Sequence, residues 1–232
     1  MTDDELIAEK EARIAELHRP EPGRTALLVI DMQRAFVEPG AALEVPEARE
    51  IVPNIRRLIS CAREVGVPVI FTRYVYSRAV PCLRGDPFGP EHLPPPPGAP
   101  TGFGRPSGNA LVGPESPQGP DSPAVIEELA PRPDELVVQG YAYDKFYGTP
   151  LDHALRSRDI RYLLITGVTA DICVNATLMS ATTREYRVTA VTDGTATLWP
   201  NILEACFDIW RRKFARLRST DEVIAELEAF GF

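Results

Sequence analysis

Residues 163–178 read LLITGVTADICVNATL, and this stretch decides the fold. An apolar run of strand length ends at a glycine, a short turn follows, and the pattern then changes to the spacing of a helix that contains Cys173. A buried strand that leads through a turn into a helix is the repeating unit of a parallel α/β sheet. We therefore predict an α/β fold in which residues 161–166 form a strand and residues 173–185 the next helix.

The same alternation of short apolar runs and amphipathic stretches continues on both sides of this unit. It predicts a three-layer αβα fold with a six-stranded parallel sheet in a single domain. The predicted strands are residues 26–30, 67–73, 135–139, 161–166, 187–192 and 214–218. The predicted helices are residues 50–65, 173–185 and roughly 200–213, with others that begin near Thr2, Thr149 and Thr220.

One segment interrupts this pattern in a chain of 232 residues. Residues 81–123 hold 13 of the 23 prolines, so they form neither a long helix nor a sheet ladder. A loop this long in a compact domain is either functional or disordered. We expect an ordered cover, with a disordered insertion as the alternative; the apolar anchors are Leu83, Phe88, Phe103, Leu111 and Val112. Residues 1–23 are expected to be a helical extension of a domain at 24–232.

Charge and composition exclude several classes of partner. The net charge of −8 disfavours nucleic acids and anionic membranes, which need a basic surface. No stretch approaches the ~18 apolar residues that span a bilayer. The acidic start MTDDELIAEK lacks the features of a signal peptide. The four cysteines have no metal-type spacing, so we expect reduced cysteines in a cytoplasmic protein.

Two reactive side chains follow predicted strands, at the edge where open α/β sheets place their sites. Asp31 comes directly after the apolar run at 26–30; the alternative is an aspartate that only caps the next turn. Cys173 lies near the start of a helix, whose free N–H groups and partial positive charge favour a thiolate and lower the thiol pKa. The same N–H groups are suited to bind an oxyanion. The alternative for Cys173 is ordinary packing in the core.

Three motifs together resemble the isochorismatase-like cysteine hydrolases: DMQ–F at 31–36, FYGTPLDHALRSR at 146–158 and GVTADICVNAT at 167–177. The resemblance covers roughly residues 24–80 and 134–215. It implies a triad of Asp, Lys and Cys, and a cis peptide bond in the turn before the cysteine, here Val168–Thr169. Family members hydrolyse small amides and ureido compounds such as nicotinamide, carbamoylsarcosine, biuret, ureidoacrylate and maleamate.

The resemblance also implies roles for individual residues. Asp31 matches the general base, and Cys173 matches the nucleophile that forms an acyl-enzyme. The backbone N–H groups of Thr169 and Cys173 match the oxyanion hole. Candidate pocket residues are Gln33, Phe36 and Tyr143, with Tyr74, Tyr76 and Trp199 also near predicted strand ends or loops.

The sequence departs from the family at the lysine. The matching position is Gly140, and the nearby lysine is Lys145, five residues later. A lysine side chain reaches about 6 Å and five extended residues span roughly 16 Å, so Lys145 completes the triad only if its loop folds back. The alternative is that Lys145 is a surface partner of Asp144. Other residues that would replace the charge are Tyr141, Tyr143, Arg34 and Arg73.

These features predict a cysteine-dependent amidohydrolase that uses no cofactor, cleaves a C–N bond of a small amide, ureido or hydrazide-type molecule, and assembles as a homo-oligomer. The metal-binding nicotinamidase branch has a histidine after the second strand, but TRYVYSRA at 72–79 has none, so no metal is expected. Cys173 argues against vinyl-ether hydrolysis, because that branch tends to lack the cysteine. The remaining alternative is an inactive ligand-binding member, weakened by Gly140.

Overall fold

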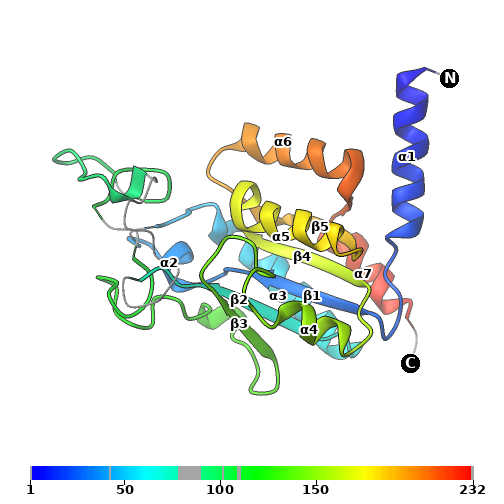
Figure 1. Cartoon of the computed structure of the whole chain (residues 1–232), viewed down its shortest axis with the longest axis horizontal. Helices are drawn as coiled ribbons and strands as arrows, with labels where there is room; N and C mark the ends of the chain where they lie inside the picture. The colour runs from blue at the N-terminus through cyan, green and yellow to red at the C-terminus, as the bar shows by residue number, and fades with distance from the viewer. Residues whose placement is uncertain (1, 42, 78–89, 101, 109–110, 231–232) are drawn as a thin grey trace.

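A six-stranded parallel sheet forms the centre of the molecule, in the order β3-β2-β1-β4-β5-β6 (Figure 1). The computed structural model describes residues 2–41, 43–77, 90–100, 102–108 and 111–230. The strands are β1 (Thr25–Ile30), β2 (Val69–Tyr74), β3 (Leu136–Gly140), β4 (Tyr162–Val168), β5 (Arg187–Ala196) and β6 (Ala215–Arg218). The predicted parallel α/β sheet is confirmed.

Helices cover both faces of the sheet, so the molecule has three layers. The helices are α1 (Asp3–Leu17), α2 (Arg34–Val37), α3 (Ala48–Glu64), α4 (Leu151–Arg156), α5 (Asn175–Thr183), α6 (Pro200–Ile209) and α7 (Thr220–Glu228), with short 3-10 turns η1 (Pro90–His92) and η2 (Glu127–Leu129) and π-helical turns η3 (Ala170–Val174) and η4 (Trp210–Phe214). Strand β1 shows how the layers form: Leu27 and Val29 pack towards α3, while Leu28 and Ile30 pack towards α5. Such a strand is buried on both faces, as its uniform apolar sequence predicts.

Some predicted boundaries differ from the structure. Strand β5 continues to Ala196, although its later residues Asp193 and Gly194 resemble a turn in sequence. The Asp193 carboxylate instead accepts hydrogen bonds from the N–H and hydroxyl of Thr220, 2.7 and 2.8 Å away. The helix predicted at residue 173 begins earlier, with the π-helical turn η3, and continues as α5.

Helix α1 extends away from the sheet and its covering helices (Figure 1). Thr2 caps its first turn in a capping box with Glu5. Leu6 and Leu17 are 46% and 41% exposed, so they do not pack into the core. The buried His18 follows the helix, and its Nδ1 lies 3.1 Å from the N–H of Val188 in β5. The helix is therefore attached to the domain mainly at its C-terminal end.

The described part of the proline-rich segment lies over the ends of β1 and β2. Val112 forms an antiparallel bridge with Tyr76, just beyond β2. The ring of Phe103 meets Phe36 edge-on, with 6.2 Å between centroids. Gly104 lies so close to Trp199 that a Cβ atom would be 2.9 Å from the indole ring. These contacts favour an ordered cover for this part; Leu83 and Phe88 lie outside the described residues.

Removal of residues 84–121 is expected to reduce turnover more than stability. The deletion takes away the contacts to Phe36, Tyr76 and Trp199 but leaves the strands intact. We expect kcat/KM to fall by roughly tenfold or more, as for the loss of a loop that shields a site from water, with a cooperative thermal unfolding transition retained. Steady-state kinetics, circular dichroism and size-exclusion chromatography measure these effects. Unchanged kinetics and oligomeric state would make the loop dispensable.

Candidate active site

Asp31 lies at the carboxyl end of β1 with its side chain fully buried. Thr72, in the neighbouring strand β2, donates its hydroxyl to Asp31 Oδ1 at 2.7 Å. The same hydroxyl oxygen accepts the N–H of Asp31 at 3.2 Å. The carboxylate therefore has a fixed orientation. Sequence reasoning missed Thr72, although a hydroxyl directly after the apolar residues 69–71 of a buried strand was a usable signal.

Lys145 completes a buried ion pair with Asp31. Its Nζ atom lies 2.7 Å from Asp31 Oδ2, and both side chains are 0% exposed. The ammonium also donates to the carbonyl oxygen of Ala142 at 3.2 Å. A buried charge requires a partner of this kind, because burial without one is very costly. The structure thus brings together two of the three predicted triad residues despite the shifted lysine.

The loop that carries Lys145 folds back onto helix α5. Thr177 accepts the N–H of Lys145 at 3.2 Å, and Thr149 donates to the Lys145 carbonyl oxygen at 2.5 Å. Asp144 accepts from the Ser180 hydroxyl at 2.7 Å, so this carboxylate is anchored to α5. The alternative of a surface pair between Asp144 and Lys145 is therefore wrong.

Gly140 leaves room for this arrangement. A Cβ atom at residue 140 would lie 3.7 Å from Cδ of Lys145. The Lys145 side chain therefore runs through the space that a long side chain from residue 140 would enter. Because residue 140 is a glycine, this space is left to the Lys145 side chain.

Cys173 is the fourth residue of η3 and is only 6% exposed. Burial raises the pKa of its thiol, the positive charge of Lys145 lowers it, and the charge of Asp31 and its hydrogen bond with the thiol raise it again. The net direction is upward. The prediction of a lowered thiol pKa is therefore wrong, because the effect of burial exceeds the lowering by Lys145. The Cys173 thiol thus lies beside the side chains of Asp31 and Lys145.

The turn before Cys173 is built around Gly167. Its φ angle is +113°, and a Cβ atom there would lie 2.0 Å from the carbonyl oxygen of Ile30. Only glycine permits this approach between the ends of β4 and β1. The Val168–Thr169 peptide bond is cis, as the family resemblance implied. Thr169 is buried, and its carbonyl oxygen accepts from two N–H groups of the following helix.

The predicted pocket residues gather around the ring of Tyr74. Gln33 is fully buried, and its amide bonds both the N–H and the carbonyl oxygen of Tyr74, at 2.7 and 3.0 Å. Gln33 therefore fixes the end of β2. The rings of Phe36, Tyr76 and Tyr143 stack on Tyr74, with centroids 6.4, 5.8 and 5.9 Å away. Tyr143 is 45% exposed and thus lies at the outer edge of this aromatic group.

Residues 25–222 match the isochorismatase domain. The chain belongs to the isochorismatase family. Two relatives in this family are ureidoacrylate amidohydrolases RutB, from Pseudomonas savastanoi pv. phaseolicola (strain 1448A / Race 6) and Pseudomonas syringae pv. syringae (strain B728a). They are 30% and 32% identical over 229 residues, which cover 92% of this chain and 87% of each relative.

Solved structures of isochorismatase-like hydrolases share the fold. A cysteine hydrolase from Pseudomonas syringae pv. phaseolicola 1448A is 28% identical with a TM-score of 0.73, covering 92% of this chain and 96% of the other. N-carbamoylsarcosine amidase from Thermoplasma acidophilum is 27% identical with a TM-score of 0.63, covering 85% and 97%. These relatives carry hydrolase names, and this isochorismatase-family chain is likewise a hydrolase.

Two of the other residues considered as replacements for the family lysine have partners away from Asp31. Arg34 pairs with Glu38 at 2.7 Å, and Tyr141 accepts from Gln139 at 2.8 Å. Nε of Arg73 is buried without a hydrogen-bond partner among the described residues.

Cys61 and Cys206 are buried free cysteines; Cys82 lies outside the described residues.

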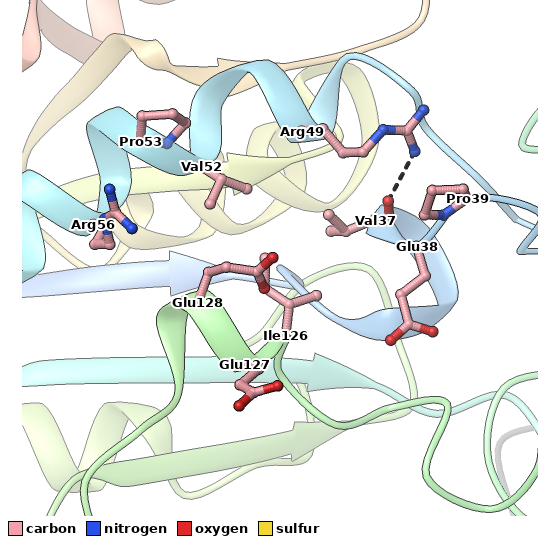
Figure 2. A pocket seen from close by; sticks show the side chains of 10 residues that line it. All are labelled: Val37, Glu38, Pro39, Arg49, Val52, Pro53, Arg56, Ile126, Glu127 and Glu128. Atoms are coloured by element: carbon pink, nitrogen blue, oxygen red, sulfur yellow. Dashed lines mark hydrogen bonds between the residues drawn. The ribbon is translucent and has the colours of Figure 1, made fainter.

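A hollow of about 470 Å³ lies beside α2 and α3 in this isochorismatase-family domain, and Figure 2 shows the side chains that line it. It is lined by Val37, Glu38, Pro39, Arg49, Val52, Pro53, Arg56, Ile126, Glu127 and Glu128. Arg49 crosses its upper edge and donates to the carbonyl oxygen of Val37 at 2.9 Å. None of the predicted site residues lines this hollow, so it is separate from the Asp31–Lys145 site.

Chelators are expected to leave the activity of this isochorismatase-family enzyme unchanged. Within the described ranges, no three His, Cys, Asp or Glu side chains are grouped so that they would hold a metal ion. The sequence also offers no histidine near the second strand. Turnover after dialysis against EDTA, with and without added zinc or iron, measures the effect. Reversible loss of turnover that zinc or iron restores would contradict the prediction.

Proposed function

We propose that the chain is a cysteine-dependent amidohydrolase that cleaves the C–N bond of a small amide or ureido molecule. The observation that carries the proposal is the fully buried Lys145–Asp31 pair, with 2.7 Å between Nζ and Oδ2, next to the buried thiol of Cys173. Asp31 is a base held ready to take the thiol proton, and Lys145 balances the negative charge that develops when it does. Perturbed ionisable groups clustered in this way are typical of catalytic sites.

In the proposed reaction, the thiol proton of Cys173 passes to Asp31 as the sulfur attacks the carbonyl carbon of the substrate. The resulting oxyanion accepts hydrogen bonds from the backbone N–H groups of Thr169 and Cys173. The C–N bond then breaks, and the leaving nitrogen takes the proton from Asp31. Water, deprotonated by Asp31, attacks the thioester, and the acid product leaves with the thiol restored.

The raised pKa of the Cys173 thiol has a consequence for this sequence of steps. A raised thiol pKa favours a mechanism in which proton transfer to Asp31 accompanies the attack by sulfur. Lys145 is the group that lowers the thiol pKa, and it stabilises the charge during this step. In this proposal the buried pair therefore takes part in catalysis, in addition to joining the loop after β3 to the end of β1.

The names of the relatives support an amide or ureido substrate, because ureidoacrylate amidohydrolases and an N-carbamoylsarcosine amidase are among them. The test is a screen for ammonia or amine release from ureidoacrylate, N-carbamoylsarcosine and related small amides. Acid quenching followed by peptide mass spectrometry should detect an acyl group on Cys173. If ligands bind but no compound yields an acyl adduct or a product, the ligand-binding alternative replaces this proposal.

The domain boundaries, the cellular location and the oligomeric state of the enzyme rest on the sequence and are part of the same proposal. We assign residues 1–23 to a helical extension and residues 24–232 to the hydrolase domain, with an insertion at 81–123. A cytoplasmic location and a homo-oligomeric state also remain predictions. In the described part of the chain, no helix has the length and apolar character needed to cross a membrane.

A further inference from the structure

The ammonium group of Lys145 meets an aromatic ring as well as a carboxylate. Lysine has three N–H donors. Asp31 Oδ2 at 2.7 Å and the carbonyl oxygen of Ala142 at 3.2 Å are its polar neighbours. The ring of Tyr74 lies on a further side, with its centroid 5.1 Å from Nζ. This distance is within the range in which the negative face of a ring attracts a cation.

The Tyr74 ring is itself held in place. The Gln33 amide bonds both main-chain groups of Tyr74, and Val75 donates its N–H to the carbonyl oxygen of Gly140 in β3 at 3.0 Å. Three aromatic rings stack around it, and Tyr74 is only 7% exposed. The ring is therefore a rigid surface, whereas Lys145 is a long side chain with several rotatable bonds.

The hydroxyl of Tyr74 takes no part in these contacts, since no hydrogen bond to it occurs among the described residues. Burial raises the pKa of the Tyr74 phenol far above its usual value, and neighbouring Tyr143 and Cys173 add to the rise. The phenol is thus neutral at any working pH. The ring face, rather than the hydroxyl, is the part of Tyr74 that interacts with Lys145.

We propose that Tyr74 is a positioning residue whose ring face holds the Lys145 ammonium against Asp31 and beside Cys173. This inference rests on the proposed function for its catalytic meaning. Lys145 comes from the loop after β3, so it reaches Asp31 only because this loop folds back. Four rotatable carbon–carbon bonds separate its ammonium group from the backbone. The ring closes one side of the site and excludes the rotamers that would withdraw Nζ. Without it, Lys145 supports the thiolate less well.

The test measures alkylation of Cys173 by iodoacetamide at pH 8.5, followed by peptide mass spectrometry, and it requires no substrate. Tyr74→Leu removes the ring, and Tyr74→Phe is the matched control that removes only the hydroxyl. We expect Tyr74→Leu to slow alkylation roughly fivefold or more relative to Tyr74→Phe, within the range of a desolvated cation–ring contact. The same pair of variants is then compared in the Lys145→Met background, where the difference should disappear.

The comparison between the parent and the Lys145→Met background distinguishes a role of Tyr74 in positioning Lys145 from an effect on the access of iodoacetamide to the thiol. If Tyr74→Leu merely opens a path to the thiol, the rate changes equally with and without Lys145, and the proposal is overturned. A second series avoids any question of folding: residue 74 is replaced by phenylalanine, 4-fluorophenylalanine and 3,5-difluorophenylalanine, which have nearly the same shape. Fluorine weakens the negative ring face, so alkylation should slow stepwise in this order. A flat series would also overturn the proposal.

This readout also distinguishes two failures. If no amide substrate is ever found but the alkylation rates show the coupling between residues 74 and 145, the positioning role stands and the amidohydrolase proposal fails. If substrates are turned over but the coupling is absent, the reverse holds. Once a substrate is known, Tyr74→Leu should lower kcat relative to Tyr74→Phe, with little difference in KM between the two variants.

Discussion

Cys173→Ala is expected to abolish amine release, with kcat/KM lowered by at least roughly 1,000-fold, as for the removal of other catalytic nucleophiles. The expected loss is large because the proposed reaction passes through a covalent bond to this sulfur. Cys173→Ser should fail in the same way, because a serine hydroxyl is a much weaker acid than a thiol and Asp31 has no second base behind it in the proposed triad. Ammonia release at substrate concentrations below KM gives the measurement.

Cys206→Ala is the matched control, since Cys206 is also a buried free cysteine and burial raises the pKa of its thiol to about 11. It packs near the same face of the sheet but belongs to α6. This variant should retain activity within about twofold of the parent, the range expected away from the reacting groups. Retention of more than a few per cent of activity in both Cys173 variants would remove the nucleophile assignment.

Lys145→Met is expected to lower turnover by at least ~100-fold, the low end of general acid–base effects. The positive charge of Lys145 lowers the pKa of the Cys173 thiol, so its loss raises that pKa further and slows alkylation at fixed pH. The variant also leaves Asp31 buried without its partner, which typically costs about 3–5 kcal/mol of stability. Urea unfolding must therefore accompany the kinetics, with Asp31→Asn/Lys145→Met as a folded control that lacks both charges.

A lysine introduced at residue 140 tests the same prediction by restoring a positive charge near Asp31. Because residue 140 faces the path of the Lys145 side chain, a lysine there should reach Asp31 once residue 145 is shortened. Gly140→Lys/Lys145→Ala is expected to recover roughly tenfold or more of the activity lost in Lys145→Ala. If Lys145→Met instead behaves like the parent while Arg34 or Tyr143 variants fail, the triad is built differently. If all match the parent, the ligand-binding alternative holds.

The fold was predictable because the central strands β1 and β4 are nearly continuous apolar runs, as is typical of a parallel sheet that is covered on both faces. The predicted end of strand β5 was wrong because tertiary contacts overrode the local preference of its sequence for a turn. Asp193 and Gly194 have the composition of a turn, but hydrogen bonds from Thr220 and Asn54 to Asp193 stabilise this region as part of β5. No local signal in the sequence identifies those partners.

The candidate site was predictable only in part for the same reason. Asp31 directly follows β1, and Cys173 lies in the helical turn that follows β4, so their approximate positions are local properties. The direction of Lys145 depends on Thr149 and Thr177, which close its loop onto α5. The raised pKa of the thiol depends on how completely the assembled layers exclude water, which the position of Cys173 at a helix start does not reveal.

The contact between Gly167 and Ile30 links the two halves of the site mechanically. The carbonyl oxygen of Ile30 precedes Asp31 by one peptide bond, and Gly167 begins the turn that leads to Cys173. Any side chain at residue 167 would have to push β1 and β4 apart, and this would increase the distance between Asp31 and Cys173, the proposed base and nucleophile. The spacing between Asp31 and Cys173 is thus set by the contact between the backbones of Gly167 and Ile30. Changes in the loops and in the aromatic group around Tyr74 would therefore leave unchanged the distance between the two proposed reacting groups.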